Sequence, residues 1–256
     1  MRVTALDGLR IGCVRYLNAQ PLVYGYEGPI RFEHPSDLAR DMAAGELDAA
    51  LVPVFEALRG GPYLVADGVA IASDGPVFSV FLAHRVPLYK VQTVMLDPAS
   101  LTSVHLIQVL LAEFHGLRPA YVAFAPAPEA QLLIGNQAID FRARAEPGWE
   151  LLDLGEEWKR CTGLPFVYAV WVLRPSLLNP VEVAEAFRVL KADGVAQVRE
   201  IAAVQRDYSE ELAYRYLTEH IRFDLGDREK AGLGRFAELL RAEGFLPEGG
   251  KGLRYV

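Results

Sequence analysis

The segment from Val91 to Leu117, VQTVMLDPASLTSVHLIQVLLAEFHGL, restricts the possible folds more than any other part of the chain. It begins with a short strand-like run, continues through the loop DPAS, and then repeats apolar residues at helical spacing. These apolar residues are Leu101, Val104, Ile107, Leu111 and Phe114. Gly116 follows them and is typical of the end of a helix. A strand joined to such a helix predicts an α/β fold with a parallel or mixed sheet.

The same alternation of strand-like and helix-like stretches runs through the rest of the chain. Strand character is found at 11–14, 29–34, 48–54, 63–73, 77–85, 120–126, 129–139 and 166–176. Helices are expected at 36–45, from 55 onward, and at 181–204, 209–221 and 226–245. No internal repeat of about 20–50 residues is visible, so a repeat architecture is not indicated.

Two lobes are expected, and they are joined by extended segments because no low-complexity linker divides the chain. The candidate crossings are RVPLYKVQTV and VWVLRPS. They divide the chain into a first lobe of residues 1–93 and 174–256 and a second lobe of residues 94–173. A cleft between two such lobes is a usual place for a small ligand.

Composition narrows the classes of partner and cofactor. Hydrophobic residues make up 52% of the chain, and the net charge of -7 argues against nucleic acid as a partner. An anionic ligand remains possible where a local site supplies donors. The two cysteines, Cys13 and Cys161, are far apart in the sequence, and the five histidines form no HxxxH or HxH pair. Neither a disulfide framework nor a metal site is indicated, and a reducing compartment fits.

The first residues, MRVTALDGLRIGCV, show neither a long apolar core nor a cleavage site of a signal peptide. No apolar run approaches about 18 residues, so a membrane span is not expected. A cytoplasmic protein with no membrane partner is the resulting expectation.

The loop RYLNAQPL, residues 15–22, follows an apolar run that resembles a buried strand. In open α/β sheets, loops beyond the carboxyl ends of strands hold ligands. The loop is therefore a candidate binding segment, although a turn containing Pro21 explains it equally well.

A second candidate is the start of the helix after DPAS, where Ser100, Thr102 and Ser103 lie. Free backbone N–H groups and the helix dipole favour an anion at such a place. Simple capping of the helix by Ser100 is the alternative.

Three further stretches carry polar groups at the ends of predicted strands. In SDGPVFSVFL, Gly75 belongs to a turn and Ser79 is either a cleft-facing hydroxyl or a hydroxyl bonded within the sheet. Glu56 is a possible general base, although a carboxylate in the first turn of a helix more often pairs with the dipole. Gly135 and Asn136 follow an apolar run, and Gly135 would allow a ligand to approach the backbone. These residues together predict a two-lobed protein that binds an anionic small molecule.

Several of these stretches occur together in one known family. The stretches are RYLNAQPL, GELDAALVPVFE, SDGPVFSVFL, LDPASLTSVHLIQVLL, LLIGNQAI and LPFVYAVW. Their order and spacing resemble those of the chorismate dehydratases of the futalosine pathway to menaquinone, from about Leu9 to the C-terminal helices. The resemblance implies a two-lobed fold similar to periplasmic binding proteins of type II, with a ligand cleft between the lobes.

The resemblance also implies a hydro-lyase. Chorismate, a dianion, would lose water and give 3-[(1-carboxyvinyl)oxy]benzoate, and no cofactor or metal would be required. Asn18 and Ser79 match the family's loop asparagine and the serine after SDGPV, and they are the implied catalytic residues. Residues expected to contact the substrate are Tyr16, Gly75, Thr102, Ser103, Gly135, Asn136 and Glu56.

The resemblance leaves two questions open. The family usually has Gly-Asp where this chain has Gly135-Asn136, so position 136 is assigned to the wall of the site or to turn structure. The general base is either Glu56 or one of the substrate's own carboxylates.

Two other functions compete with this one. The 1,4-dihydroxy-6-naphthoate synthase of the same pathway shares the fold, but its opening loop resembles SPCPND instead of YLNxxPL. A non-catalytic cytoplasmic protein that binds a small anion is the other alternative. The sequence gives no expectation for the oligomeric state.

Overall fold

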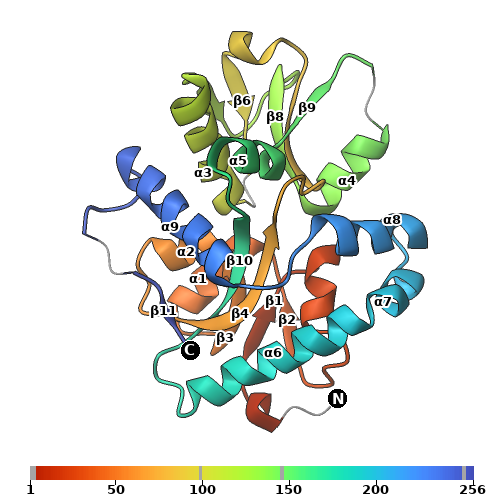
Figure 1. Cartoon of the computed structure of the whole chain (residues 1–256), viewed down its shortest axis with the longest axis vertical. Helices are drawn as coiled ribbons and strands as arrows, with labels where there is room; N and C mark the ends of the chain where they lie inside the picture. The colour runs from red at the N-terminus through yellow and green to blue at the C-terminus, as the bar shows by residue number, and fades with distance from the viewer. Residues whose placement is uncertain (1–3, 98–99, 145–146, 250–251) are drawn as a thin grey trace.

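The computed structural model describes residues 4–97, 100–144, 147–249 and 252–256. These residues form two sheets, stacked along the long axis of the molecule, with helices around each (Figure 1). The α/β class predicted from the alternation of strands and helices is confirmed. Pro98 and Ala99 of the expected DPAS loop lie outside the described residues.

The first sheet has six strands among the described residues, in the order β11-β4-β10-β3-β1-β2. Its strands are β1 (Ile11–Cys13), β2 (Ile30–Phe32), β3 (Ala49–Pro53), β4 (Leu64–Ser73), β10 (Phe166–Leu173) and β11 (Arg254–Tyr255). The strands β1, β2 and β3 are parallel, while β10 runs antiparallel between β3 and β4. Every residue of β1 and β3 is buried, as the continuous apolar runs of the sequence predict.

The second sheet is smaller and has the order β7-β6-β8-β5-β9 within the described part of the chain. Its strands are β5 (Val80–His84), β6 (Thr93–Met95), β7 (Ala120–Val122), β8 (Ala130–Ile134) and β9 (Glu150–Asp153). The strand β5 pairs antiparallel with both β8 and β9. Each sheet is the centre of one lobe.

The chain crosses between the lobes at other places than the sequence predicts. The strand β5 already belongs to the second sheet, although residues up to 93 were expected in the first lobe. The strand β10 belongs to the first sheet, although residues up to 173 were expected in the second. The crossings are therefore residues 74–79 and the short segment before Phe166. The turn signal at Asp74-Gly75 marks the first crossing, and the sequence pattern alone does not separate a turn from a crossing.

The helices surround the two sheets (Figure 1). They are α1 (Pro35–Ala43), α2 (Val54–Leu58), α3 (Thr102–Val109), α4 (Gly135–Arg144), α5 (Leu154–Thr162), α6 (Pro180–Ala196), α7 (Val198–Val204), α8 (Glu210–Arg215) and α9 (Asp227–Ala242). The 3-10 turns are η1 (Thr4–Leu6), η2 (Leu17–Leu22) and η3 (Leu88–Lys90), and the π-helical turns are η4 (Leu110–Phe114) and η5 (Tyr216–His220). Within the described residues, no helix is long and apolar enough to cross a membrane.

The strand expected at 129–139 is too long. The strand β8 ends at Ile134, and α4 begins at Gly135. A short apolar run followed by Ala138 and Ile139 fits both periodicities, and the left-handed φ of Gly135, +56°, makes the change of direction possible.

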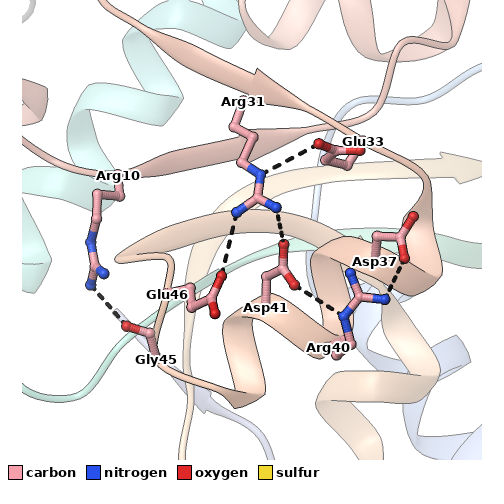
Figure 2. A network of polar contacts seen from close by, with 8 residues as sticks. All are labelled: Arg10, Arg31, Glu33, Asp37, Arg40, Asp41, Gly45 and Glu46. Atoms are coloured by element: carbon pink, nitrogen blue, oxygen red, sulfur yellow. Dashed lines mark hydrogen bonds and ion pairs between the residues drawn. The ribbon is translucent and has the colours of Figure 1, made fainter.

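A network of charges fixes the edge of the first sheet (Figure 2). Arg31 of β2 contacts the carboxylate of Asp41 in α1 at 2.7 Å, and Arg40 contacts the same carboxylate at 3.2 Å. Asp41 is only 4% exposed, so its charge is balanced by these two guanidinium groups. The network joins the edge strand to α1, next to the strand β1 that leads to the candidate binding loop.

The candidate loop itself forms η2, which packs on α6. A Cβ atom at Gly194 of α6 would lie 1.8 Å from the carbonyl oxygen of Pro21, so the two backbones are in direct contact. No residue other than glycine fits this contact. The helix α6 therefore sets the position of the loop that carries Asn18.

We expect Gly194→Ala to destabilise the protein by about 1–3 kcal/mol, because the added methyl group must push η2 away from α6. The matched control is Gly234→Ala in α9, where a Cβ atom would meet nothing within 4 Å. That variant should be stabilised by about 0.5–1 kcal/mol because alanine is the better helix former. Urea unfolding of both variants measures the difference, and equal stabilisation would show that the close contact is absent.

Candidate functional site

A pocket lies between the two sheets, at the carboxyl ends of β1, β3 and β8. Its empty volume is about 600 Å³ including the open mouth, which is in the range of small-molecule sites. The walls come from both lobes. The lining residues are Val14, Tyr16, Asn18, Pro35, Leu51, Pro53, Ile71, Val77, Val80, Ser100, Leu101, Thr102, Ser103, Ile134, Gly135, Tyr168 and Ala169.

The opening loop contributes Tyr16 and Asn18 to this pocket. Their neighbours Leu17 and Ala19 are buried in the core. The 3-10 helix therefore packs some side chains into the core and presents others to the pocket. Among the described residues, Asn18 Oδ1 has no hydrogen-bond partner although it is buried. Leaving a buried amide oxygen unpaired costs about 1–3 kcal/mol of stability. An unpaired atom of this kind needs an explanation, and a ligand that binds to it is one.

Tyr16 and Gly135 are in contact across the pocket. A Cβ atom at position 135 would lie 3.0 Å from the Tyr16 ring, so a side chain there would force the ring to move. Burial and the nearby charge of Asp97 raise the pKa of Tyr16 to about 12. Tyr16 is therefore a neutral hydroxyl at neutral pH and not an acid–base group.

The start of α3 supplies hydroxyl groups. Ser100, Thr102 and Ser103 are all buried and all line the pocket. Thr102 Oγ1 accepts a hydrogen bond of 3.2 Å from the backbone N–H of Phe55, which leaves its own proton free to donate. Leu101 occupies the cap position of α3, and its side chain makes no capping hydrogen bond. Simple capping by Ser100 is therefore not what the structure shows.

Ser79 lies behind the pocket wall, between the lining residues Val77 and Val80. Its side chain is fully buried, and its Oγ is 2.7 Å from the hydroxyl of Tyr216. The residue before it, Phe78, has a φ of +69°, and the Ser79 N–H donates to the carbonyl of Val77 at 2.8 Å. This is a γ-turn of the strained kind, and such strain is concentrated at functional sites.

Asp153 holds this strained turn in place. Its carboxylate accepts hydrogen bonds from the backbone N–H groups of Val77 at 3.0 Å and Phe78 at 2.7 Å. The same carboxylate caps α5 by accepting from Gly155 at 3.0 Å and Glu156 at 3.1 Å. One buried side chain therefore joins the first crossing to the start of α5.

Besides Ser79, three residues expected at the site lie outside the pocket lining. Gly75 forms the turn of the first crossing, with a φ of +124° that disfavours any other residue. Asn136 is the second residue of α4, and its backbone carbonyl accepts a hydrogen bond from the Tyr208 hydroxyl at 3.3 Å.

Glu56 is the third of these residues, and its position corrects the expectation that it faces the ligand. Its carboxylate accepts a hydrogen bond from Tyr63 at 3.1 Å and pairs with Arg59 at 2.5 Å. Both partners follow Glu56 closely in the sequence, and they hold this buried carboxylate outside the pocket lining. Glu56 is therefore not positioned as a general base for the pocket.

Sequence reasoning missed Tyr168, Asp153 and Tyr216. Tyr168 lines the pocket, and its hydroxyl is 3.2 Å from Ser73 Oγ. Burial raises its pKa well above the usual range of a phenol. The stretch LPFVYAVW contains it, but an aromatic residue in a buried strand is ordinarily part of the core.

The polar groups of the pocket are neutral. The lining residues that the structure describes are hydroxyls, one amide and apolar side chains, with no carboxylate, guanidinium or ammonium group among them. In the described part of the chain, no group of three or more His, Cys, Asp or Glu residues could hold a metal ion. The arrangement can bind carboxylates by hydrogen bonds from hydroxyls and from the free N–H groups of α3.

Comparison with known proteins identifies the family. Residues 9–242 match a protein family described as menaquinone biosynthesis. The chain belongs to this family. A curated chorismate dehydratase from Thermus thermophilus is 31% identical, over 93% of this chain and 98% of that protein. A chorismate dehydratase from Campylobacter jejuni is 26% identical, over 89% of this chain and 91% of that protein.

Solved structures of low identity share the fold of this menaquinone biosynthesis protein. A protein from Archaeoglobus fulgidus has a TM-score of 0.72 at 15% identity, covering 93% of this chain and 98% of its own. The periplasmic aliphatic sulphonate binding protein of Escherichia coli has a TM-score of 0.59 at 15% identity, covering 94% of both chains. The two-lobed fold resembling periplasmic binding proteins is thereby confirmed.

We expect Asp153→Ala to destabilise the protein by about 2–4 kcal/mol, because it removes a helix cap and leaves the two N–H groups of the crossing unpaired. Ser209→Ala is the matched control, because Ser209 only caps α8 by accepting from Leu212 at 3.3 Å. The control should lose about 1 kcal/mol. Thermal and urea unfolding measure both values, and similar losses in the two variants would argue against the anchoring role of Asp153.

Proposed function

We propose that this protein is a chorismate dehydratase, which eliminates water from chorismate and forms 3-[(1-carboxyvinyl)oxy]benzoate for menaquinone biosynthesis. The observation that carries the proposal is the 31% identity with the chorismate dehydratase of Thermus thermophilus over 93% of this chain. The pocket supports it, because both lobes supply neutral hydrogen-bond donors to one small enclosed space.

The reaction requires little besides correct positioning. The ring carbon bearing the enolpyruvyl ether loses a proton, the neighbouring carbon loses its hydroxyl group, and the two leave as water. The ring becomes aromatic, so the overall reaction is strongly downhill. The protein must hold the ring and assist the departure of the proton and the hydroxyl.

We assign the residues as follows. The hydroxyls of Thr102 and Ser103, with the N–H groups at the start of α3, bind one carboxylate. The Asn18 amide oxygen is buried in the pocket wall without a partner in the described structure, and we assign it to accept a hydrogen bond from the ring hydroxyl of the substrate and fix the orientation of that group. Tyr16 and Gly135 shape the wall against which the ring lies.

The general base is a carboxylate of the substrate. Glu56, the protein carboxylate considered for this role, is directed to Tyr63 and Arg59 instead. The described lining residues include no carboxylate and no histidine. A base delivered by the substrate needs no protein group with a pKa near neutrality. We propose the cytoplasm as the location of this activity, and the elimination as written requires no cofactor.

Purified protein given chorismate should release a product lighter by one water, detected by chromatography with mass detection. Asn18→Ala should lower kcat by about 100-fold, because an interaction made to the leaving group is lost. The control Asn179→Ala removes a surface amide that donates only to Glu182, at 3.3 Å, and should leave kcat unchanged. A wild-type rate in Asn18→Ala would remove this residue from the site.

Unchanged chorismate with measurable binding would favour a non-catalytic anion-binding protein instead. Turnover of a later intermediate of the pathway, without turnover of chorismate, would favour the 1,4-dihydroxy-6-naphthoate synthase.

The pH profile tests the identity of the base. The pKa of Tyr16 is about 12 and that of Tyr168 is raised well above its usual range, so both phenols keep their protons at neutral pH. Carboxylates exposed to water titrate near about 4, so kcat/KM should be flat between about pH 6 and about pH 9 and fall only in acid. An inflection inside the flat range would show that a protein side chain is the base.

A further inference from the structure

The hydroxyl of Tyr216 is hydrogen-bonded to the implied catalytic side chain of Ser79, and Asn18 is among the groups that influence its pKa, although Tyr216 does not line the pocket itself. It is the first residue of the π-helical turn η5, directly after α8, and it is 2% exposed. Its hydroxyl is 2.7 Å from Ser79 Oγ, across 137 residues of sequence. A π-helical turn shifts the register of a helix by one residue and often occurs at functional sites.

We propose that Tyr216 is a positioning residue that fixes the hydroxyl of Ser79 and the amide of Asn18 relative to each other. The inference rests on the proposed function. The three residues lie in separate segments of the chain. Asn18 comes from the first lobe, Ser79 is the last residue of the first crossing, directly before β5, and Tyr216 comes from the C-terminal helices.

The protonation state of Tyr216 limits how the three groups can pair. Burial raises its pKa, while hydrogen bonding by Ser79 and Asn18 acts in the opposite direction. The phenol therefore keeps its proton at neutral pH, and it has one proton to donate. It can donate to Ser79 and accept from the amide nitrogen of Asn18, or accept from Ser79 and donate to the amide oxygen.

Only the first arrangement agrees with the unpaired amide oxygen of Asn18. When Tyr216 donates to Ser79, Ser79 keeps its own proton for a second hydrogen bond. When Tyr216 accepts from the amide nitrogen, the Asn18 oxygen is left to accept from a substrate hydroxyl. That oxygen is the buried atom for which the described structure shows no partner. The phenol thus selects the directions of both neighbouring hydrogen bonds.

The packing around Tyr216 keeps its ring in place without the hydroxyl. The Phe78 ring lies with its centroid 6.3 Å from that of Tyr216, and the same Phe78 ring stacks on His220 at 5.1 Å. A phenylalanine at position 216 would keep these ring contacts. The hydroxyl can therefore be tested apart from the fold.

Tyr216→Phe should lower kcat for chorismate by about 10- to 100-fold with KM changed less than about threefold, because only the alignment of the reacting groups is lost. Tyr63→Phe is the matched control. It removes another buried phenol hydroxyl, which is bonded to Glu56 at 3.1 Å and does not belong to the pocket lining. The control should show a similar loss of stability in urea unfolding with unchanged kcat.

A double-mutant cycle separates positioning from a merely structural effect. If Tyr216 acts through Ser79, then Ser79→Ala combined with Tyr216→Phe should be no slower than the slower of the two single variants. Losses of kcat that multiply, a wild-type kcat in Tyr216→Phe, or a rise of KM alone would overturn the proposal.

Failure of the proposed function can be distinguished from failure of the positioning role of Tyr216. If the wild-type protein does not convert chorismate, the proposed function fails. If the wild-type protein is active and Tyr216→Phe is equally active, only the role of Tyr216 fails. Should Tyr216→Phe not fold, Ser79→Thr, which keeps the hydroxyl, should retain more kcat than Ser79→Ala. Equal losses in those two variants would contradict the positioning role.

Discussion

The carboxylate of Asp153 is the interaction on which the rest of the site depends. It accepts four backbone N–H groups, two from the first crossing between the lobes and two from the start of α5. These hydrogen bonds stabilise the strained φ of +69° at Phe78. The turn at Phe78 in turn directs Ser79 toward Tyr216. A single buried side chain thus converts the connection of two lobes into a defined arrangement of polar groups.

The neutral lining of the pocket has a chemical advantage for a dianionic substrate. A carboxylate paired with a guanidinium or ammonium group has a lowered pKa and is a weaker base. Hydroxyls and backbone N–H groups bind a carboxylate with less loss of basicity. The described lining residues are therefore compatible with a substrate that supplies its own base. A neutral lining is consistent with the family to which the chain belongs, the menaquinone biosynthesis family, and with its relatives, which are chorismate dehydratases.

Local patterns predict what is local in the structure. The loop after β1 and the start of α3 follow from strand and helix signals, and the structure brings Tyr16, Asn18, Thr102 and Ser103 into one pocket. Contacts between distant segments have no such signal. The bond between Ser79 and Tyr216 spans 137 residues, and Asp153 reaches back 75 residues to Phe78. The lobe boundaries were displaced for the same reason, because a turn and a crossing look alike until the sheets are paired.

The first crossing also determines how the two lobes can move. In addition to the bonds of Asp153, Asp74 at its start pairs with Lys159 of α5 at 2.5 Å and with Arg228 of α9 at 3.0 Å. A hinge must absorb changes in backbone torsion angles, and this segment is held at both ends and strained in the middle. The bonds of Asp153 fasten the end of the crossing to the second lobe, so a change in the angle between the lobes has to be absorbed near Gly75 and act on the ion pairs of Asp74. The first crossing is therefore a restrained connection and not a flexible tether.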